Sequence, residues 1–478
     1  MSTAVRTDRD LLRVIVVAAG LGWCVLFIVV GLVYRLELYG DGAMFSYAIA
    51  AQDVWAFHWH NISGRLTTYV LTMAPAEGFV ALNGCAAGGV FVYGLLFFLI
   101  PLFGLLATFS ADRSRGRIIF AFACASTAVL DPLVFGFPSE MWMAHAWFWP
   151  ALAVGHYAPR SWGGNALVFA TLFALMFSHE GGFVLAGAIL FSLMLRGIRD
   201  VAFLRVVAFV IVVAVIWVAV QVIFPTGPYF ADVYLRAALG FFDLAIFRSN
   251  VIILLVSVLV GFGIAAALLT RLTSRAPVYA AAMVVAALAL YWCGFDHALH
   301  ASNRYYMRTL LVVLTPLFGI PAALYVLDTD GRLRLAKAMA TRVISFARSV
   351  PTSALIATFL LVTLVQVVET AKFLGGWTDY KAAVRRLATG TASDPALGDP
   401  RFVSSDRIGP ELNRLSWFST TPYLSAILAE FAPARLVVDP SSNYFWLSCA
   451  TATANLNAPR AIPRETRVLV RTYSCEHR

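Results

Sequence analysis

Three clusters of ionisable and aromatic residues carry the side chains best suited to chemistry. The first surrounds Asp41, which stands between Gly40 and Gly42 in a tyrosine- and phenylalanine-containing stretch. Glycines on both sides leave the backbone free to turn and the carboxylate unshielded. A carboxylate placed in this way can accept a proton from a substrate hydroxyl. The alternative is that Asp41 caps the N-terminus of a helix.

The second cluster is the stretch from Phe57 to Arg65, with two alternating histidines, His58 and His60. On an extended segment these two side chains face the same way, so they can bind a divalent metal ion. Together with Arg65 they can also bind a polar substrate. The alternative is an aromatic and polar belt at a membrane interface.

The third cluster joins two distant parts of the chain. The acid–base pair His179 and Glu180 lies in one part, and Arg304, Tyr305 and Arg308 lie in the other. An imidazole beside a carboxylate can act as an acid or a base, and an arginine fork suits a phosphate group. The alternatives are a structural His–Glu pair and arginines that only anchor a helix at the membrane surface.

The composition defines the solvent in which these residues must work. The 478 residues are 60% hydrophobic and 13% charged, against about 25% charged in soluble domains. A chain this apolar needs lipid around it, and lipid requires every backbone polar group to be satisfied internally. The apolar runs are long and unbroken rather than alternating, which favours helices over a barrel.

The apolar runs predict about eleven transmembrane helices. They cover residues 12–34, 86–109, 118–135, 144–157, 165–177, 182–195, 202–224, 251–270, 278–295, 306–327 and 352–368. Arginines gather in every second connection, so the net charge of +10 indicates membrane orientation rather than nucleic-acid binding. We therefore expect a cytoplasmic N-terminus, a periplasmic C-terminus, a long first outer loop over 35–85 and a transmembrane domain over 1–370 in the cytoplasmic membrane.

Residues 371–478 are more polar and predict a small extracytoplasmic α/β domain. Within this segment we expect a helix over 409–431 and short strands over 435–438 and 467–472. It also contains Cys449 and Cys475, which can form a disulfide if the segment is periplasmic. The other cysteines lie in or beside apolar runs and are expected to be inert packing residues.

The predicted topology puts the chemically capable residues on one side. Asp41, Glu140, His179 and Glu180 all fall on the outer face, together with most of the other acids and histidines. No acid falls at the centre of a predicted span, although Asp131 comes nearest. This distribution favours a site at the outer membrane surface over a transmembrane conduit.

The chain resembles the GT-C superfamily of membrane glycosyltransferases in this arrangement: Asp41 after the first span, an aromatic loop reaching Arg65, and Glu140 in the second outer loop. The resemblance implies an all-α polytopic fold and transfer of a sugar, with inversion, from a polyprenyl-phosphate donor to a glycan or glycolipid acceptor. Asp41 would be the base, Glu140 a second acid, and Arg304 or Arg308 the phosphate ligand. Many members carry paired acids in the first loop, whereas Gly42 follows Asp41 here, so the resemblance leaves a divalent cation open.

Two other readings remain open on the sequence. One is a transporter or flippase with a periplasmic accessory domain, for which internal pseudo-symmetry would be typical; the sequence shows no such repeat. The other is an enzyme like the O-antigen ligases, which use a larger, diphosphate-linked donor.

Overall fold

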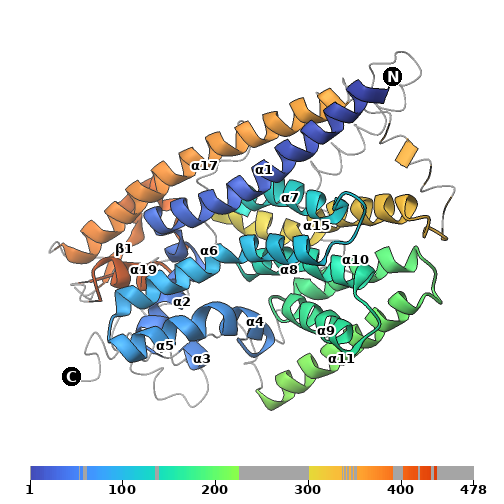
Figure 1. Cartoon of the computed structure of the whole chain (residues 1–478). Helices are drawn as coiled ribbons and strands as arrows, with labels where there is room; N and C mark the ends of the chain where they lie inside the picture. Colours follow the sequence, from blue (N-terminus) through green and yellow to red (C-terminus); the bar gives the residue numbers. More distant parts are fainter. Residues whose placement is uncertain are drawn as a thin grey trace, which may run out of the picture.

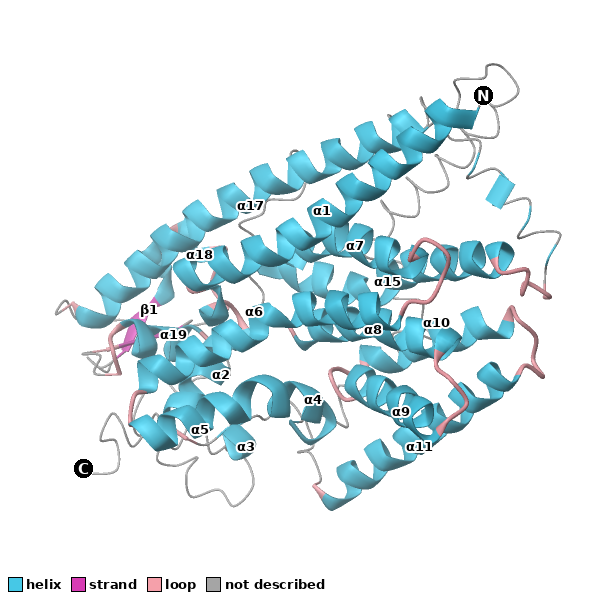
Figure 2. Cartoon of the chain, in the orientation of Figure 1, coloured by secondary structure: helices cyan, strands magenta, loops and turns pink. Residues whose placement is uncertain are grey.

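A computed structural model describes the chain at residues 2–52, 54–57, 62–134, 139–224, 301–335, 352–390, 402–417, 420–431 and 435–438, and at single positions between 337 and 348. Over these residues the protein is largely helical, with two short strands at one end of the molecule (Figures 1 and 2). The helical prediction is therefore confirmed for the described part of the chain.

Among the described residues, three helices are long and apolar enough to cross a membrane: Arg9–Tyr34 within α1 (Ser2–Tyr34), α6 (Ala86–Ala111) and α11 (Val201–Ile223). They indicate a membrane protein. Shorter helices follow other predicted runs: α7 (Ile118–Leu130), α8 (Glu140–Tyr157), α9 (Trp162–Met176) and α10 (Gly181–Met194). The 29-residue helix α15 (Ala301–Thr329) covers the predicted run 306–327. The runs 251–270 and 278–295 lie outside the described residues, so the total of eleven spans stays a prediction.

The helices α8 and α11 differ strongly in burial. Nearly every residue of α8 from Glu140 to His156 is buried, between α6, α9, α10 and α15 (Figure 1). By contrast, α11 leaves large aliphatic side chains exposed, among them Val215 and Val222, which are 62% and 74% exposed. An exposed row of valines is unfavourable in water but suits lipid, so α11 is the outer wall of the bundle.

The predicted first outer loop is a chain of short helical segments. In order these are η1 (Leu36–Leu38), α2 (Asp41–Ala50), α3 (Val54–Phe57), η2 (Ile62–Arg65), α4 (Leu66–Thr68), the π-helical turn η3 (Tyr69–Met73) and α5 (Ala74–Asn83). Within this loop, α2 is buried from Gly42 to Ile49, so it does not lie exposed on a surface. Its residues are apolar on all sides, so α2 needs cover on all sides, and α6 and α19 provide it.

The last predicted span, 352–368, is the first half of a single 38-residue helix, α17 (Thr352–Thr389). It runs alongside α1 (Figure 1) and is tied to the end of α1 by Trp377, whose Nε1 donates to the carbonyl of Tyr34 at 3.0 Å. Tyr39 packs edge-on against Phe373 and Trp377, with ring centroids 5.2 Å apart in each pair. The helix therefore continues without a break across the boundary expected near residue 371.

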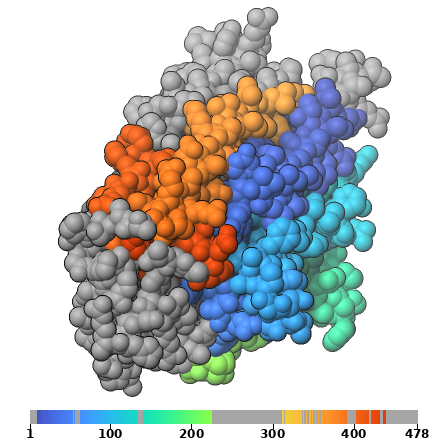
Figure 3. All heavy atoms as spheres, turned by 90° about the vertical axis from the view of Figure 1, so that its left-hand side faces the viewer, coloured from blue at the N-terminus to red at the C-terminus, as the bar shows by residue number. Residues whose placement is uncertain are grey.

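The described C-terminal segments pack on the first outer loop. The parallel strands β1 (Phe402–Ser404) and β2 (Leu436–Val438) pair with Phe402 opposite Leu436, and α19 (Thr421–Leu428) lies against α2, with Tyr47 and Tyr423 ring centroids 5.5 Å apart. Figure 3 looks onto this end and shows these segments beside α17 and the first-loop residues. The strand expected over 435–438 is confirmed, and β1 was not expected.

The single helix expected over 409–431 is wrong. The structure has two helices there, α18 (Pro410–Asn413) and α19, and both have proline in the first turn. Pro422 has no backbone N–H to donate to the preceding turn of a continuous helix. It is favoured instead in the first turn, so a new helix, α19, begins there.

Candidate active site

The end of the bundle near the first outer loop gathers several of the predicted site residues. The segment from Gly64 to Thr68 is fixed there by bonds to distant helices. Thr67 N–H donates to the Phe177 carbonyl at 3.1 Å, and Thr68 Oγ1 donates to the Ser178 carbonyl at 3.2 Å. From α11, Trp217 Nε1 donates to the Gly64 carbonyl at 3.2 Å. These bonds hold the first loop against the turn between α9 and α10.

Arg65 is the centre of the arrangement. Its Nη1 donates to Glu140 Oε1 at 2.8 Å, and its Nη2 and Nε donate to the two oxygens of Glu180 at 3.0 and 3.3 Å. The arginine and Glu140 side chains are 11% and 1% exposed. Because a guanidinium presents several donors in a rigid fork, it can hold two carboxylates at once. Arg65 therefore joins the first loop, the start of α8 and the start of α10.

His179 extends this group. Its Nδ1 accepts the Gly181 backbone N–H at 2.9 Å, and its Nε2 lies 3.6 Å from Glu180 Oε2. A ring nitrogen that accepts a bond carries no proton, so the proton of the neutral ring is on Nε2 and faces Glu180. The sequence pair His179 and Glu180 is thus a real structural contact.

The electrostatics follow from burial and from the central arginine. Burial favours the neutral form of Glu180, but the charge of Arg65 and its hydrogen bonds outweigh it and hold the pKa of Glu180 at about 2. Burial likewise lowers the pKa of Arg65, and the carboxylates of Glu140 and Glu180 more than reverse this, so its pKa lies above the ordinary value. Glu180 and Arg65 are therefore ionised together over the physiological range.

A second set of acids surrounds Tyr93 of α6, which the sequence did not single out. Tyr93 is fully buried, and its hydroxyl forms no hydrogen bond with the described residues. The carboxylates of Glu140, Glu37 and Asp41 all interact electrostatically with this phenol. Tyr93 therefore lies among three acids that are far apart in the sequence, and the sequence held no signal for it beyond a tyrosine in an apolar run.

Glu37 is the second residue that sequence reasoning left out of the site. It is 3% exposed, and its side chain packs over Gly94, where an added Cβ would stand 3.2 Å from Glu37 Cβ. Arg35 Nε donates to Glu37 Oε1 at 3.4 Å. Burial raises the pKa of Glu37 to about 7, against the charges of Arg35 and Lys381. Burial lowers the pKa of Lys381, in the distal half of α17, to about 8.

Asp41 is the first residue of α2, and the N-cap position belongs to Gly40. The proposed alternative role of Asp41 as the helix N-cap is therefore not the one observed. Asp41 is half-buried and, through Tyr93, belongs to the same group of acids as Glu140 and Glu37.

The predicted phosphate ligands Arg304 and Arg308 and their neighbour Tyr305 lie in the first turns of α15, and only their backbone is described. The contact between α10 and α15 shows at which end of the bundle these three residues lie. A Cβ added to Gly181, at the start of α10, would stand 2.8 Å from the side chain of Val312. Arg308 comes four residues before Val312, about 6 Å along the helix axis. The backbone of Arg308 therefore lies at the end of the bundle that holds Glu180.

Other predicted residues lie outside the described part of the chain: His58, His60, Cys449 and Cys475. Among the residues that are described, no group of three or more His, Cys, Asp and Glu side chains could hold a metal ion. The metal and disulfide hypotheses therefore stay predictions.

Deeper in the bundle, Asp131 and His145 form a separate buried polar group. His145 Nε2 lies 3.5 Å from Asp131 Oδ1, and His145 Nδ1 lies 2.8 Å from Thr315 Oγ1 of α15. Both ionisable side chains are at most 1% exposed. Such groups inside a membrane protein are rare and are candidates for function in their own right.

Comparison of the chain with protein-family models, with curated proteins and with solved structures found no match.

Proposed function

We propose that this protein is an inverting membrane glycosyltransferase that moves a sugar from a polyprenyl-phosphate donor to a glycan or glycolipid acceptor at the outer face of the cytoplasmic membrane. One observation carries the proposal. Arg65 draws Glu140 and Glu180 together at one end of the helical bundle, beside His179 and close to the acids around Tyr93. A lipid-linked donor presents its head group at that level of a membrane.

The chemistry requires a base, a cation for the leaving group and limited water. In the proposed reaction a carboxylate, Asp41, takes the proton of the acceptor hydroxyl. The hydroxyl oxygen then attacks the anomeric carbon, and the bond from that carbon to the phosphate oxygen breaks. Arg304 and Arg308 receive the phosphate. Because Arg65 already donates three hydrogen bonds to the two carboxylates, its proposed role is to position Glu140 and Glu180.

The test is a transfer assay with purified full-length protein in detergent, polyprenyl-phosphate sugars labelled in the sugar, and envelope glycolipids of a deletion strain as acceptors. Sugar transfer that Asp41→Asn abolishes and Asp10→Asn leaves intact supports the proposal, because Asp10 is an exposed acid on α1. A deletion strain with an unchanged envelope glycan profile, together with no transfer in vitro, would reject it. Transfer only from diphosphate-linked oligosaccharides would instead indicate a ligase.

A transporter or flippase is the second candidate, and the buried pair Asp131 and His145 favours it. Proton-coupled transport uses ionisable groups inside the bundle, and these two side chains lie between α7, α8 and α15. Liposomes separate the two functions. A transporter moves labelled lipid-linked sugar across the bilayer without changing it chemically, and Asp131→Asn slows that movement.

A further inference from the structure

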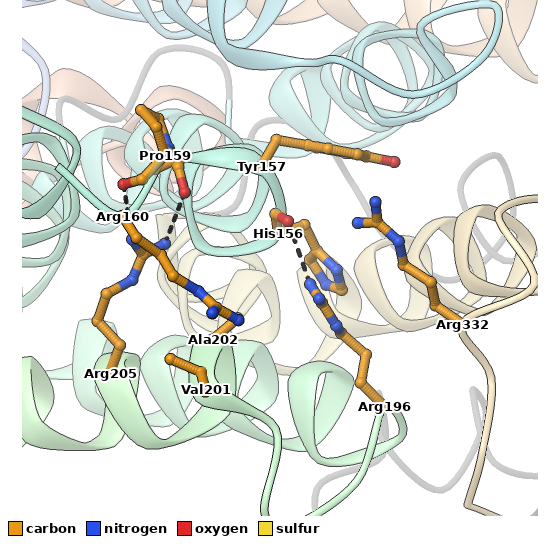
Figure 4. Close-up of a pocket in the computed structure, with 10 residues that line it drawn as sticks. His156, Tyr157, Pro159, Arg160, Arg196, Val201, Ala202, Arg205 and Arg332 are labelled. Carbon is orange, nitrogen blue, oxygen red and sulfur yellow. Dashed lines mark hydrogen bonds between the residues drawn. The ribbon is translucent and has the colours of Figure 1, made fainter.

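At the opposite end of α8 from Glu140, the structure contains a cavity of about 230 Å³ that the proposed reaction does not use. An 18-residue helix separates the two ends by about 27 Å. The cavity lies between the end of α8, the start of α11 and the loop after α15, and four arginines line it: Arg160, Arg196, Arg205 and Arg332 (Figure 4).

Two of the four arginines have clear structural partners. Arg205 donates to the carbonyls of Pro159 and Ala158 at 2.9 and 3.0 Å, and Arg196 donates to the carbonyl of His156 at 3.1 Å. These carbonyls belong to the last turn of α8 and the two residues after it, where cations are favourable. Arg196 also lies 3.5 Å from Asp200. Capping of α8 therefore explains the position of the Nη atoms of both Arg196 and Arg205.

The other two arginines have no such explanation. The guanidinium groups of Arg160 and Arg332 form no hydrogen bond or ion pair with the part of the chain that the structure describes. The buried Nε of Arg205 likewise lacks a hydrogen-bond partner there, whereas Arg196 Nε is the atom that lies 3.5 Å from Asp200 Oδ2. The nearest carboxylates are already bonded, Asp200 to Arg196 and Asp330 to the hydroxyl of Tyr157 at 3.0 Å. The cavity therefore holds more positive charge than its own acids neutralise.

The arginines act on one another as neighbouring charges. Arg196 interacts unfavourably with both Arg332 and Arg160, and Figure 4 shows these side chains entering the same space from three different parts of the chain. Arg160 and Arg332 are exposed, so both guanidinium groups are solvated and remain accessible to an anion that enters the cavity. Arginine forks match the oxygens of a phosphate group in particular.

The exposed face of α11 beside the cavity indicates what kind of molecule carries the phosphate group. Val201 and Leu204, in the first turns of α11, are 46% and 51% exposed, and Ile211 further along is 58% exposed. An apolar stripe that starts at a basic cavity fits a molecule with a charged head and hydrocarbon chains. We infer that this cavity binds the phosphate group of an acidic phospholipid, with its acyl chains along α11.

The inference is tested on the delipidated full-length protein in detergent by titration with dioctanoyl phosphatidylglycerol, dioctanoyl phosphatidylcholine and glycerol phosphate. The double variant Arg160→Gln with Arg332→Gln removes the two unpartnered charges and leaves the caps of α8 in place. The matched control is Arg334→Gln, an exposed arginine two residues from Arg332 that does not line the cavity. Binding is followed by native mass spectrometry and by the rise in melting temperature.

We expect phosphatidylglycerol to bind most tightly, the double variant to weaken it about tenfold or more, and the control to match the wild type. Equal protection by glycerol phosphate, also lost in the double variant, would keep the phosphate site but make its ligand a soluble ester. Phosphatidylglycerol binding that is absent, or unchanged in the double variant, would overturn the inference. Because the readout is binding, the result is independent of any sugar transfer.

Discussion

Arg65 Nη1 and Glu140 Oε1 lie 2.8 Å apart although 75 residues separate them in the sequence. The bond connects the middle of the first outer loop to the first turn of α8, which is buried over nearly its whole length. The same guanidinium reaches Glu180 at the start of α10. One side chain thus sets the relative positions of three elements at the candidate site.

Replacing Arg65 by leucine is expected to destabilise the protein by about 3–5 kcal/mol, because it leaves two buried carboxylates without their cation. Arg65→Lys should fall between leucine and the wild type, since it keeps the charge but loses the fork. Thermal unfolding in one detergent measures both variants. The control, Arg385→Leu, removes an exposed pair with Glu430 and should change stability by about 0–1 kcal/mol. Equal effects of Arg65→Leu and Arg385→Leu would show that the Arg65 pairs add little.

Asp41→Asn keeps the size of the side chain and removes its basicity. If Asp41 is the general base, sugar transfer should fall by about 10²–10⁴-fold while the melting temperature stays close to that of the wild type. The assay is donor turnover by purified protein, with Asp10→Asn as the control. Near-normal transfer by Asp41→Asn would shift the role of base to Glu140 or Glu180.

Arg304 tests the phosphate-ligand hypothesis. Arg304→Lys should lower turnover about tenfold, because lysine cannot offer two parallel bonds to phosphate, and Arg304→Ala should lower it about a hundredfold. Arg113→Lys, at an exposed position after α6, serves as the matched control. If Arg304 only anchors the helix at the interface, both side chains reach the surface equally and Arg304→Lys is silent.

Glu37 predicts a dependence of stability on pH. Its pKa is about 7 in the folded protein and 4.5 as the ordinary value. Between these values the folded state keeps the proton and the unfolded state has lost it, so stability is highest at low pH and falls as the pH rises through this window. Glu37→Gln should remove that fall, and Glu411→Gln, at a largely exposed acid, should leave it unchanged. Melting temperatures across the window measure the effect, and identical profiles for wild type and Glu37→Gln would contradict it.

The sequence by itself determined the helical character and the positions of most described helices. Long apolar runs can satisfy their backbone only within a helix, so α6, α9, α10 and α11 begin and end within three residues of their predicted bounds. It also identified His179 next to Glu180, because that contact is local.

Only the tertiary structure decided which distant residues meet. No pattern along the chain predicts that Arg65 binds Glu140 and Glu180. Nor does the sequence predict that Tyr93 lies near the three acids Glu37, Asp41 and Glu140. Hydropathy reports whether a residue prefers lipid or water, but the facing partner depends on how the helices pack. The burial of α2 and the arginine cavity at the end of α8 were missed for the same reason: each is built from segments that only the packed bundle brings together.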